Sequence, residues 1–332
     1  MNPRMQKLKI VVPVFNDWDS FGMLVRDLNG VAAELGLKLS VSAVDDGSTM
    51  PVTVDCDALT EFRHLDQIEL IQLATNVGHQ RAIAVGLCVA IEDNDCDAVV
   101  VMDADGEDSP TAIKELVQAA GNGGDYCVVA RRGKRWEDFI FKTAYAMYKL
   151  FFRLLTGKEI LFGNFCLLSR SYVRRLVNIP DLWNNVPAAI LRSRLPIRMV
   201  TVDRAPRYAG RSKMGLTSLV VHGFSGISVY ADMIFVRFFF FSSVLFSLSV
   251  VSILLVLTLR IFFPAYATPG WATTVTFGMS ILLVQILSFT LSFILVLFNG
   301  RLQMPAIPLE TYKAYIDHRY LLHLKDSQMQ GN

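Results

Sequence analysis

The segment Ala98–Asp105 reads AVVVMDAD, a short apolar run that ends in an Asp-x-Asp pair. A continuous apolar run of this length predicts a strand buried on both faces, as is typical of parallel sheets. In open parallel sheets, ligands bind beyond the carboxyl ends of the strands. The two aspartates follow such an end, so the segment predicts an α/β domain with a ligand site at one edge of its sheet.

The neighbouring sequence repeats this pattern of strand and helix. Further strands are expected at Leu8–Phe15, Leu39–Val44, Gln67–Leu73, Tyr126–Ala130 and, as the last strand, Ile197–Arg204. Helices are expected between them, at Ser20–Leu35, Val52–Phe62, Val77–Glu92 and Pro110–Ala120. The alternation predicts βαβ units and a mostly parallel sheet.

Polar residues follow the carboxyl ends of four of these strands. The four clusters are Asn16-Asp17, Asp45-Asp46, Asn76 and Asp103/Asp105. Aspartate and asparagine also start turns and cap helices, which explains any one cluster but is a weaker account of all four. Together they predict an acidic crevice, where an Asp-x-Asp pair suits Mg²⁺ or Mn²⁺ bound to the diphosphate of a nucleotide.

The last third of the chain is almost free of charge. Between Arg237 and Arg301 the only charged residue is Arg260. Phe238–Leu259 is long enough to cross a hydrocarbon core of about 30 Å, and so is Thr273–Phe298, which follows the breaks at Pro264 and Pro269. Basic residues flank the outer ends, so the positive-inside rule predicts a two-span hairpin with both termini in the cytoplasm. The alternative is a re-entrant pair.

Two basic stretches precede the hairpin. The first, Glu137–Leu155, is helical in pattern and rich in aromatic residues, and it either packs on the sheet or lies near a membrane surface. The second, Arg204–Lys213, comes directly before an apolar helix expected at Leu216–Asp232. Its basic residues suit either a lipid phosphate substrate or anionic head groups.

Composition and missing motifs exclude several other classes. The 332 residues carry a net charge of only +2, without the basic excess typical of nucleic-acid-binding proteins. Five scattered cysteines without a C-x-x-C pair argue against a disulfide framework and against a zinc site. The sequence has neither G-x-G-x-x-G nor G-x-x-x-x-G-K-[ST], which argues against a dinucleotide fold and a P-loop ATPase.

The order of the motifs resembles that of family-2 glycosyltransferases. It is most similar to the polyprenyl-phosphate glycosyltransferases, which include dolichol-phosphate mannose synthases and bacterial undecaprenyl-phosphate glycosyltransferases. The resemblance covers about residues 8–215, and the motifs that carry it are Val12–Asp17 (VPVFND), Asp45–Ser48 (DDGS), Asn76–Gln80 (NVGHQ), Asp103–Asp105 and Arg207–Lys213 (RYAGRSK). It implies a GT-A fold and a sugar-nucleotide donor.

The resemblance also implies roles for single residues. The expected nucleotide-sugar contacts are Pro13, Asn16, Asp17, Asp45, Asp46, Asn76 and Asp103. A cation, Mg²⁺ or Mn²⁺, is expected on Asp103, Asp105 and Glu107. Asp105, Arg207 and Lys213 are the expected catalytic residues, and the acceptor phosphate is assigned to Arg131, Arg207, Ser212 and Lys213. His79 is interpreted as a structural or capping residue, with a diphosphate contact as the alternative.

The chain departs from the family pattern at three points. Gly106-Glu107 follows the Asp-x-Asp pair where relatives have Leu-Gln, and Gly163–Cys166 reads GNFC where many relatives have Gly-Asp-Phe-Arg. The Q-x-x-R-W motif of processive synthases is missing, which disfavours polymer synthesis. Asn164 cannot accept a proton as a carboxylate does, but a phosphate acceptor needs no base because it is mostly dianionic at neutral pH.

These inferences predict a membrane-bound, inverting, metal-dependent glycosyltransferase. It would move a sugar from a nucleotide diphosphate, UDP favoured over GDP, to a polyprenyl phosphate at a bacterial inner membrane. The alternatives are a lipid hydroxyl acceptor or a degenerate scaffold, and a homo-oligomer stays open. The expected divisions are a GT-A domain at 1–213, juxtamembrane amphipathic helices at 214–236, two transmembrane helices at 237–299 and a cytoplasmic tail at 300–332.

Overall fold

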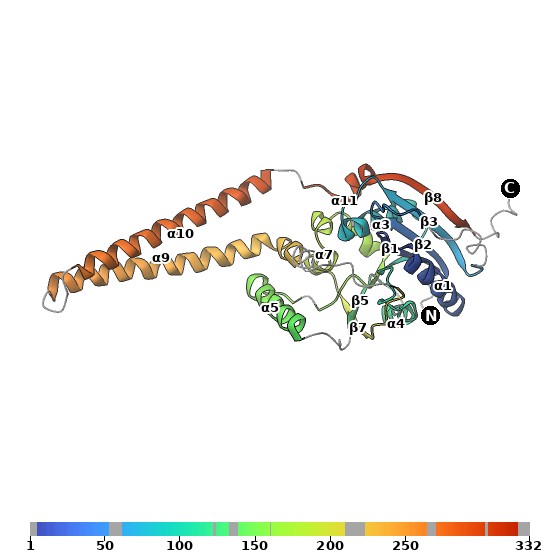
Figure 1. Ribbon diagram of the computed structural model, residues 1–332, viewed down its shortest axis with the longest axis horizontal. Helices are drawn as coiled ribbons and strands as arrows, with labels where there is room; N and C mark the ends of the chain where they lie inside the picture. The colour runs from blue at the N-terminus through green and yellow to red at the C-terminus, as the bar shows by residue number, and fades with distance from the viewer. Residues whose placement is uncertain are drawn as a thin grey trace. The chain divides into compact units, whose positions relative to one another are not determined.

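A computed structural model describes residues 5–52, 62–121, 124–132, 139–159, 161–209, 223–263, 270–302 and 305–324 (Figure 1). The chain divides into two compact units. Residues 1–149, 159–229 and 306–332 form the first, which we call the sheet domain. Residues 150–158 and 230–305 form the second, which we call the hairpin unit.

The sheet domain is built on eight strands in the order β7-β5-β6-β4-β1-β2-β3-β8. The four central strands, β4, β1, β2 and β3, run parallel to one another. Two strands, β6 and β8, run antiparallel to their neighbours. The strands are β1 (Lys7–Val14), β2 (Lys38–Asp45), β3 (Leu65–Leu73), β4 (Ala98–Val101), β5 (Cys127–Arg132), β6 (Cys166–Ser169), β7 (Arg198–Val202) and β8 (Ile316–Leu324). The predicted mostly parallel sheet is confirmed.

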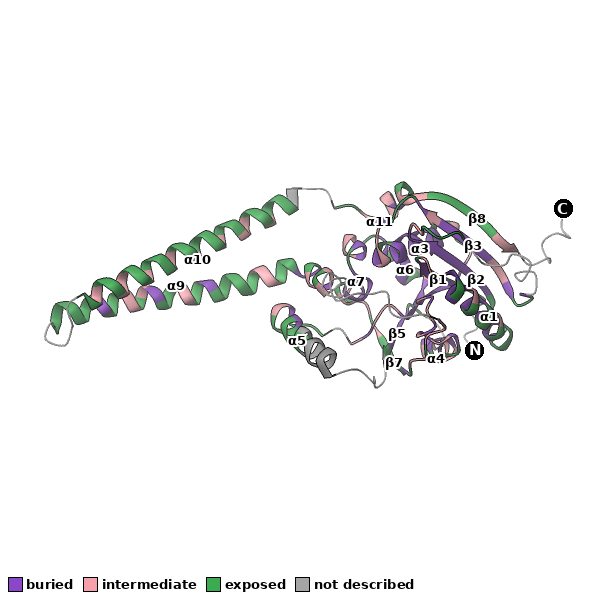
Figure 2. Ribbon diagram, viewed as in Figure 1, coloured by how far each residue is buried: buried purple, intermediate pink, exposed green. Residues whose placement is uncertain are grey.

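Helices cover both faces of this sheet, and successive strand residues face alternate cores. Ile10 and Val12 lie in the cluster that includes α1 (Trp18–Leu35) and α4 (Ile113–Ala120). Val11 lies in the cluster that includes α3 (His79–Asp93), α6 (Arg170–Leu176) and α7 (Val186–Arg192). Figure 2 shows the central strands as buried, which explains why their sequences are continuously apolar.

Two strands of the sheet, β6 and β8, were not predicted from the sequence. β6 lies within a stretch that contained no expected strand, and it is only four residues long. β8 lies within the segment expected as a tail, so the expectation that Ile197–Arg204 holds the last strand is wrong. β8 pairs with β3, and Arg319 joins the two strands through its contact with Glu69 at 2.7 Å. Most of the helix expected at Val52–Phe62 lies outside the described residues.

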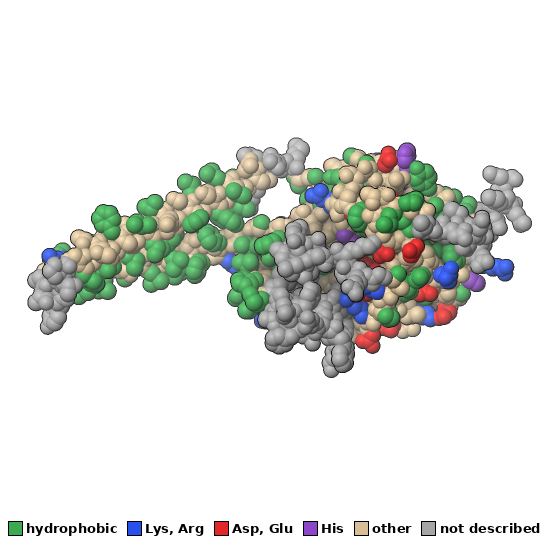
Figure 3. Space-filling view, viewed as in Figure 1, with side chains coloured by type: hydrophobic (Ala, Val, Ile, Leu, Met, Phe, Trp, Pro, Cys, Tyr) green, Lys and Arg blue, Asp and Glu red, His purple; other side chains and the backbone are tan. Residues whose placement is uncertain are grey.

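The hairpin unit contains two long apolar helices. α9 spans Ala231–Phe262 and α10 spans Trp271–Leu302, and they contain both predicted crossings. Both are long and apolar enough to cross a membrane, and Figure 3 shows hydrophobic side chains along their length. The buried residues of α9 are Ser242, Ser249 and Val256, which lie seven residues apart, and the two serines are small enough to suit close helix packing. Phe293 of α10 stacks on Phe235 of α9 with 5.6 Å between ring centroids.

Candidate active site

The Asp-x-Asp pair lies in a tight loop directly after β4. The loop is closed by the amide of Glu107, which donates to Asp105 Oδ1 at 2.9 Å, and by the amide of Asp103, which donates to Asp108 Oδ2 at 3.2 Å. Gly106 takes a left-handed φ of 84°, where an L side chain is strained. Burial, followed by the charge of Asp103, raises the pKa of Asp105. The loop therefore holds two carboxylates close together in a place that favours a neutralising cation.

A basic segment at 204–208 lies on this loop. The backbone amide of Tyr208 donates to the carbonyl of Asp105 at 2.9 Å, and its ring covers the α-carbon of Gly106. The Arg207 guanidinium contacts Asp105 Oδ2 at 2.6 Å and Glu107 Oε1 at 3.3 Å. Arg204 forms a second ion pair with Glu107. The structure thus brings Arg207 into contact with the Asp-x-Asp pair.

Glu107 forms ion pairs that the sequence did not predict. Its two carboxylate oxygens are bound by Arg204 and Arg207. Those pairs align the basic segment with the loop, and they leave the carboxylate occupied by arginine. We therefore leave Glu107 out of the residues proposed to hold a cation.

His79 lies beside the Asp-x-Asp pair at the first position of α3. Its Nε2 is 3.2 Å from Asp103 Oδ1 and 3.0 Å from Asn164 Nδ2. Burial by itself lowers the pKa of His79, but the carboxylates of Asp103, Asp46 and Asp105 outweigh it and raise the pKa. The N-cap of α3 is Gly78, so His79 does not cap the helix.

Asn164 is held in a chain of hydrogen bonds that begins at a backbone amide. The Val186 amide donates to Gln80 Oε1 at 2.7 Å, and Gln80 Nε2 donates to Asn164 Oδ1 at 3.1 Å. Because the first donor is a backbone amide, Gln80 must present its NH₂ group to Asn164, and Asn164 must present its own to His79. An aspartate here would instead accept from both neighbours.

The other predicted donor contacts tie neighbouring loops together. Asn16, with φ of 52°, accepts from the amides of Thr49 and Met50 at 2.9 and 3.0 Å. Asp46 accepts from the amides of Val77 and Gly78 at 2.7 and 3.1 Å. These contacts join the loops after β1, β2 and β3 at the carboxyl edge of the sheet.

Four further residues were predicted to contact the nucleotide sugar, and each of them lies in a different local environment. Asp45 accepts from the Ser48 amide at 2.9 Å, and Asp17 accepts from the Ser20 hydroxyl at 2.9 Å. Pro13 is buried in β1 and Asn76 is exposed. The backbone of Asn76 comes so near Gly47 that a Cβ on the glycine would lie 2.5 Å from its nitrogen.

Of the four residues predicted to bind the acceptor phosphate, two are among the described residues. Arg131 is exposed near the end of β5. Ser212 and Lys213 lie outside the described residues. The structure thus brings Asp103, Asp105, Glu107 and Arg207 together, and it adds His79, Asn164, Arg204 and Tyr208. The last two were missed as individual residues, although Arg204 begins the basic stretch recognised in the sequence.

A divalent cation fits the Asp-x-Asp pair if phosphate oxygens and water complete its coordination. Among the described residues, no group of three or more His, Cys, Asp or Glu side chains is arranged to hold a metal ion. Mg²⁺ needs only one or two carboxylates when phosphate oxygens and water complete its shell. Asp103 and Asp105 supply that number, so the pair fits a cation that arrives with a diphosphate.

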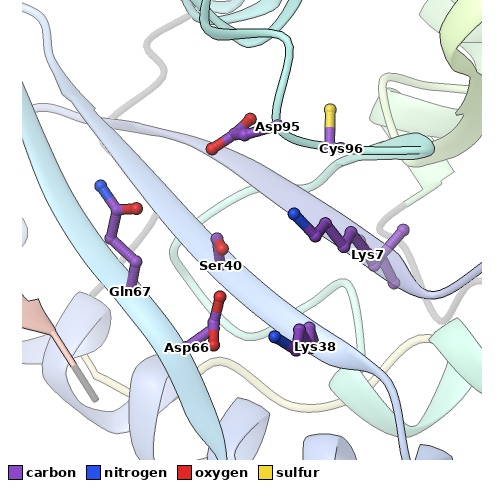
Figure 4. A pocket seen from close by; sticks show the side chains of 8 residues that line it. Lys7, Lys38, Ser40, Asp66, Gln67, Asp95 and Cys96 are labelled. Atoms are coloured by element: carbon purple, nitrogen blue, oxygen red, sulfur yellow. The ribbon is translucent and has the colours of Figure 1, made fainter. Parts of the chain in front are cut away.

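A polar pocket lies at the opposite edge of the sheet (Figure 4). Lys7 and Lys38, the first residues of β1 and β2, line it together with Asp66 and Asp95. These are the amino ends of the parallel strands. The pocket is therefore separate from the edge that carries the Asp-x-Asp pair.

Comparison with known proteins places the chain in a family. The model of glycosyl transferase family 2 matches residues 9–177, just over half of the chain, and the chain belongs to this family. With the sheet described above, this membership confirms the GT-A fold.

Individual relatives are less than 30% identical to this chain in the two examples that follow. The uncharacterised glycosyltransferase sll0501 of Synechocystis is 27% identical over 271 residues, which cover 79% of this chain and 82% of the relative. The undecaprenyl-phosphate 4-deoxy-4-formamido-L-arabinose transferase of Klebsiella pneumoniae is 29% identical over 179 residues. That match covers 53% of this chain and only about half, 51%, of the relative. The resemblance to polyprenyl-phosphate glycosyltransferases is confirmed.

Proposed function

We propose that this family-2 glycosyltransferase transfers a sugar, with inversion, from a nucleotide diphosphate to a polyprenyl phosphate, and that UDP-sugars are preferred over GDP-sugars. The observation that carries the proposal is the contact of Arg207 with Asp105 at 2.6 Å, at the carboxyl edge of the sheet, in a chain with two membrane-length apolar helices. The contact places a cationic side chain beside carboxylates suited to a cation and diphosphate. A relative named as an undecaprenyl-phosphate transferase supports the acceptor class.

The acceptor chemistry follows from Asn164. A phosphate oxygen attacks the anomeric carbon, the bond from that carbon to the diphosphate breaks, and the nucleoside diphosphate leaves with the bonding electrons. The attacking phosphate monoester has a second pKa near 6, so at neutral pH it carries no proton that must be removed. The amide of Asn164, which cannot act as a base, is compatible with this acceptor and unfavourable for a hydroxyl.

Charge is the main difficulty of this reaction, since two anionic phosphates must approach each other. We assign the cation, Mg²⁺ or Mn²⁺, to Asp103 and Asp105, where it would neutralise the leaving diphosphate. Arg207, with Ser212, Lys213 and Arg131, is assigned to the acceptor phosphate. Asn16, Asp17, Asp45, Asp46, Asn76 and Pro13 surround the nucleotide in this proposal.

The proposed setting is the cytoplasmic face of a bacterial inner membrane. Arg237 of α9 and Arg301 of α10 lie near the helix ends that lead to the sheet domain in sequence, whereas the other two ends carry only Arg260 of α9. That asymmetry favours a two-span hairpin with both termini in the cytoplasm.

The experiment is a transfer assay with the full chain in membranes. Labelled UDP- and GDP-sugars are supplied with undecaprenyl phosphate, with undecaprenol, or without a lipid. We expect labelled glycolipid only with the phosphate acceptor and only with a divalent cation. Product with undecaprenol alone would favour a hydroxyl acceptor, and no product with any donor, together with no nucleotide binding in the presence of Mn²⁺, would indicate a scaffold.

A further inference from the structure

The side chain of Asn164 lies at the same edge of the sheet as the Asp-x-Asp pair. β6 runs antiparallel to β4, and Cys166 at the start of β6 is paired with Val101 at the end of β4. Asn164 comes shortly before β6 and Asp103 comes shortly after β4, so the topology brings the two together. Both are partly exposed, and His79 contacts both side chains. A ligand bound at Asp103 therefore lies beside the amide of Asn164.

The amide of Asn164 is held with its nitrogen towards this site. Gln80 is 8% exposed, and its Oε1 accepts a hydrogen bond from the buried backbone amide of Val186, a group that can only donate. The Nε2 of Gln80 therefore faces Asn164 Oδ1, and turning the Asn164 amide over would bring two NH₂ groups together. The backbone is fixed as well, because the carbonyl of Phe165 accepts from the Ala130 amide at 2.9 Å. The polarity of Asn164 is thus set from the buried side of the site.

The Nδ2 atom of Asn164 has one more hydrogen than its contacts use. An asparagine amide carries two N–H donors, which point in different directions. One faces His79 Nε2 at 3.0 Å, and no other acceptor for Nδ2 is found among the residues that the structure describes. The Oδ1 atom is occupied by Gln80. The second N–H is therefore available to an acceptor that enters the site.

A substrate phosphate is the acceptor that best suits this N–H. The Asp-x-Asp pair fits a cation whose shell is completed by phosphate oxygens, so those oxygens lie beside the pair. A hydrogen bond to an ionised oxygen is roughly twice as strong as one between neutral groups. A carboxylate at position 164 would instead set a negative charge against the phosphate. The amide therefore favours an anionic ligand at a place where a carboxylate would oppose it.

We propose that Asn164 donates a hydrogen bond to a substrate phosphate, and that Gln80 is the positioning residue that keeps this donor turned towards the site. The phosphate belongs either to the nucleoside diphosphate or to the acceptor lipid, and separate measurements distinguish the two. The inference rests on the function proposed above and deepens it, because it gives Asn164 a direct contact with the ligand. Gln80 acts only through Asn164.

The experiment measures binding, so that it does not depend on turnover. Calorimetry on the full chain in detergent uses two titrations. The first adds UDP in the presence of Mn²⁺, and the second adds farnesyl phosphate to the protein with UDP and Mn²⁺, with farnesol as the uncharged control.

The central variant is Asn164→Asp, which keeps the size of the side chain and the hydrogen bond from Gln80. Asn164→Ala removes the donor without adding charge. Asn178→Asp, on an exposed asparagine of the same domain, is the matched control for charge.

The proposal predicts an order of affinities in at least one titration. Asn164→Ala should weaken phosphate binding roughly tenfold, which is the scale of one hydrogen bond to a charged group. Asn164→Asp should weaken it further, because it also adds a negative charge. Loss in the UDP titration identifies the donor phosphate, and loss in the farnesyl phosphate titration identifies the acceptor phosphate. Farnesol binding, and both titrations of Asn178→Asp, should stay close to wild type.

A double-mutant cycle tests the role of Gln80. Gln80→Met keeps the length of the side chain but removes the group that orients Asn164, so it should weaken the same titration. In an Asn164→Ala background it should weaken phosphate binding no further. Its fall in melting temperature, caused by the unpaired Val186 amide, should persist in both backgrounds. A merely structural Gln80 would weaken binding equally in both.

The outcomes separate this inference from the proposed function. Either Asn164 variant with wild-type or tighter affinity in both titrations would overturn the inference, and so would a wild-type protein that binds neither phosphate. Wild-type protein that binds both phosphates but transfers no sugar to undecaprenyl phosphate would refute the proposed function alone.

Discussion

Replacement of Glu107 by glutamine separates the two roles available to this carboxylate. In the structure the Glu107 side chain is 20% exposed, and its carboxylate pairs with Arg204 and Arg207. The sequence resemblance instead implied that this carboxylate binds the cation. Glutamine keeps one oxygen for one arginine and loses the charge. A hydrogen bond to a charged group contributes about 1.5–3 kcal/mol, so after partial screening the loss is about 1–2 kcal/mol.

The assay measures both stability and cation binding in detergent. The loss corresponds to a fall of roughly 2–8 °C in the melting temperature for a unit of this size. Mn²⁺ affinity in the presence of UDP, measured by calorimetry, should stay within roughly threefold of wild type, since a factor of three is under 1 kcal/mol. The exposed Glu115→Gln on α4 controls for charge, and Asp105→Asn controls for loss of a ligand. A Glu107→Gln protein that melts like wild type but binds Mn²⁺ as weakly as Asp105→Asn would refute our assignment.

Three further predictions concern other parts of the sheet domain. Gly47→Ala should lower the melting temperature, because the left-handed φ of 69° at Gly47 costs about 1–2 kcal/mol when the residue carries a side chain. It should also raise the donor KM more than it lowers kcat, because the added Cβ displaces the loop at Asn76. Arg319→Gln should destabilise the protein most at neutral pH: burial raises the pKa of Glu69, but Lys9 and Arg319 outweigh it and lower the pKa, so this stability is present above roughly pH 4 and is lost as pH falls. Thermal melts should therefore show a constant gap to wild type from pH 7 down to about pH 4, and a gap that closes as pH falls further and the carboxylate is protonated. Asn164→Asp should move the His79 titration to higher pH in ¹⁵N-histidine NMR spectra because it adds a negative charge, and Asn164→Ala, which only removes a donor to the ring nitrogen, should move it less.

The parallel core was predictable because its sequence pattern is local. Ala98–Val101 is continuously apolar, and the polar residues that follow it mark the strand end. The strand at 316–324 was not predictable by the same argument. Its pattern IDHRYLLHL mixes charged and apolar residues because it is an edge strand, largely exposed, and its pairing partner β3 lies some 250 residues earlier in the chain.

The residues of the candidate site also differ in whether a local sequence pattern predicts their position. Side chains placed by the ends of strands, such as Asp103 and Asp105, were identified because topology alone brings them to one edge. The ion pair of Glu107 with Arg204 was not predictable, because the two residues are about a hundred positions apart and nothing local indicates their contact. His79 was interpreted as a structural residue because a histidine at a helix start has many uses, and only the fold brings Asp103 and Asn164 to its ring.

Arginine–carboxylate pairs fix the sheet-domain segments that precede and follow the hairpin unit in the sequence. Before α9, Arg207 pairs with Asp105, and after α10, Arg319 pairs with Glu69 and Asp93 at 2.7 Å each. Each contact sets an arginine against carboxylates on a central strand, its following loop or the end of α3. Because the chain leaves the sheet domain before α9 and returns to it as β8, the hairpin unit is an insertion within the sequence of that domain, and the chain on both sides of the insertion is fixed to the sheet by an arginine.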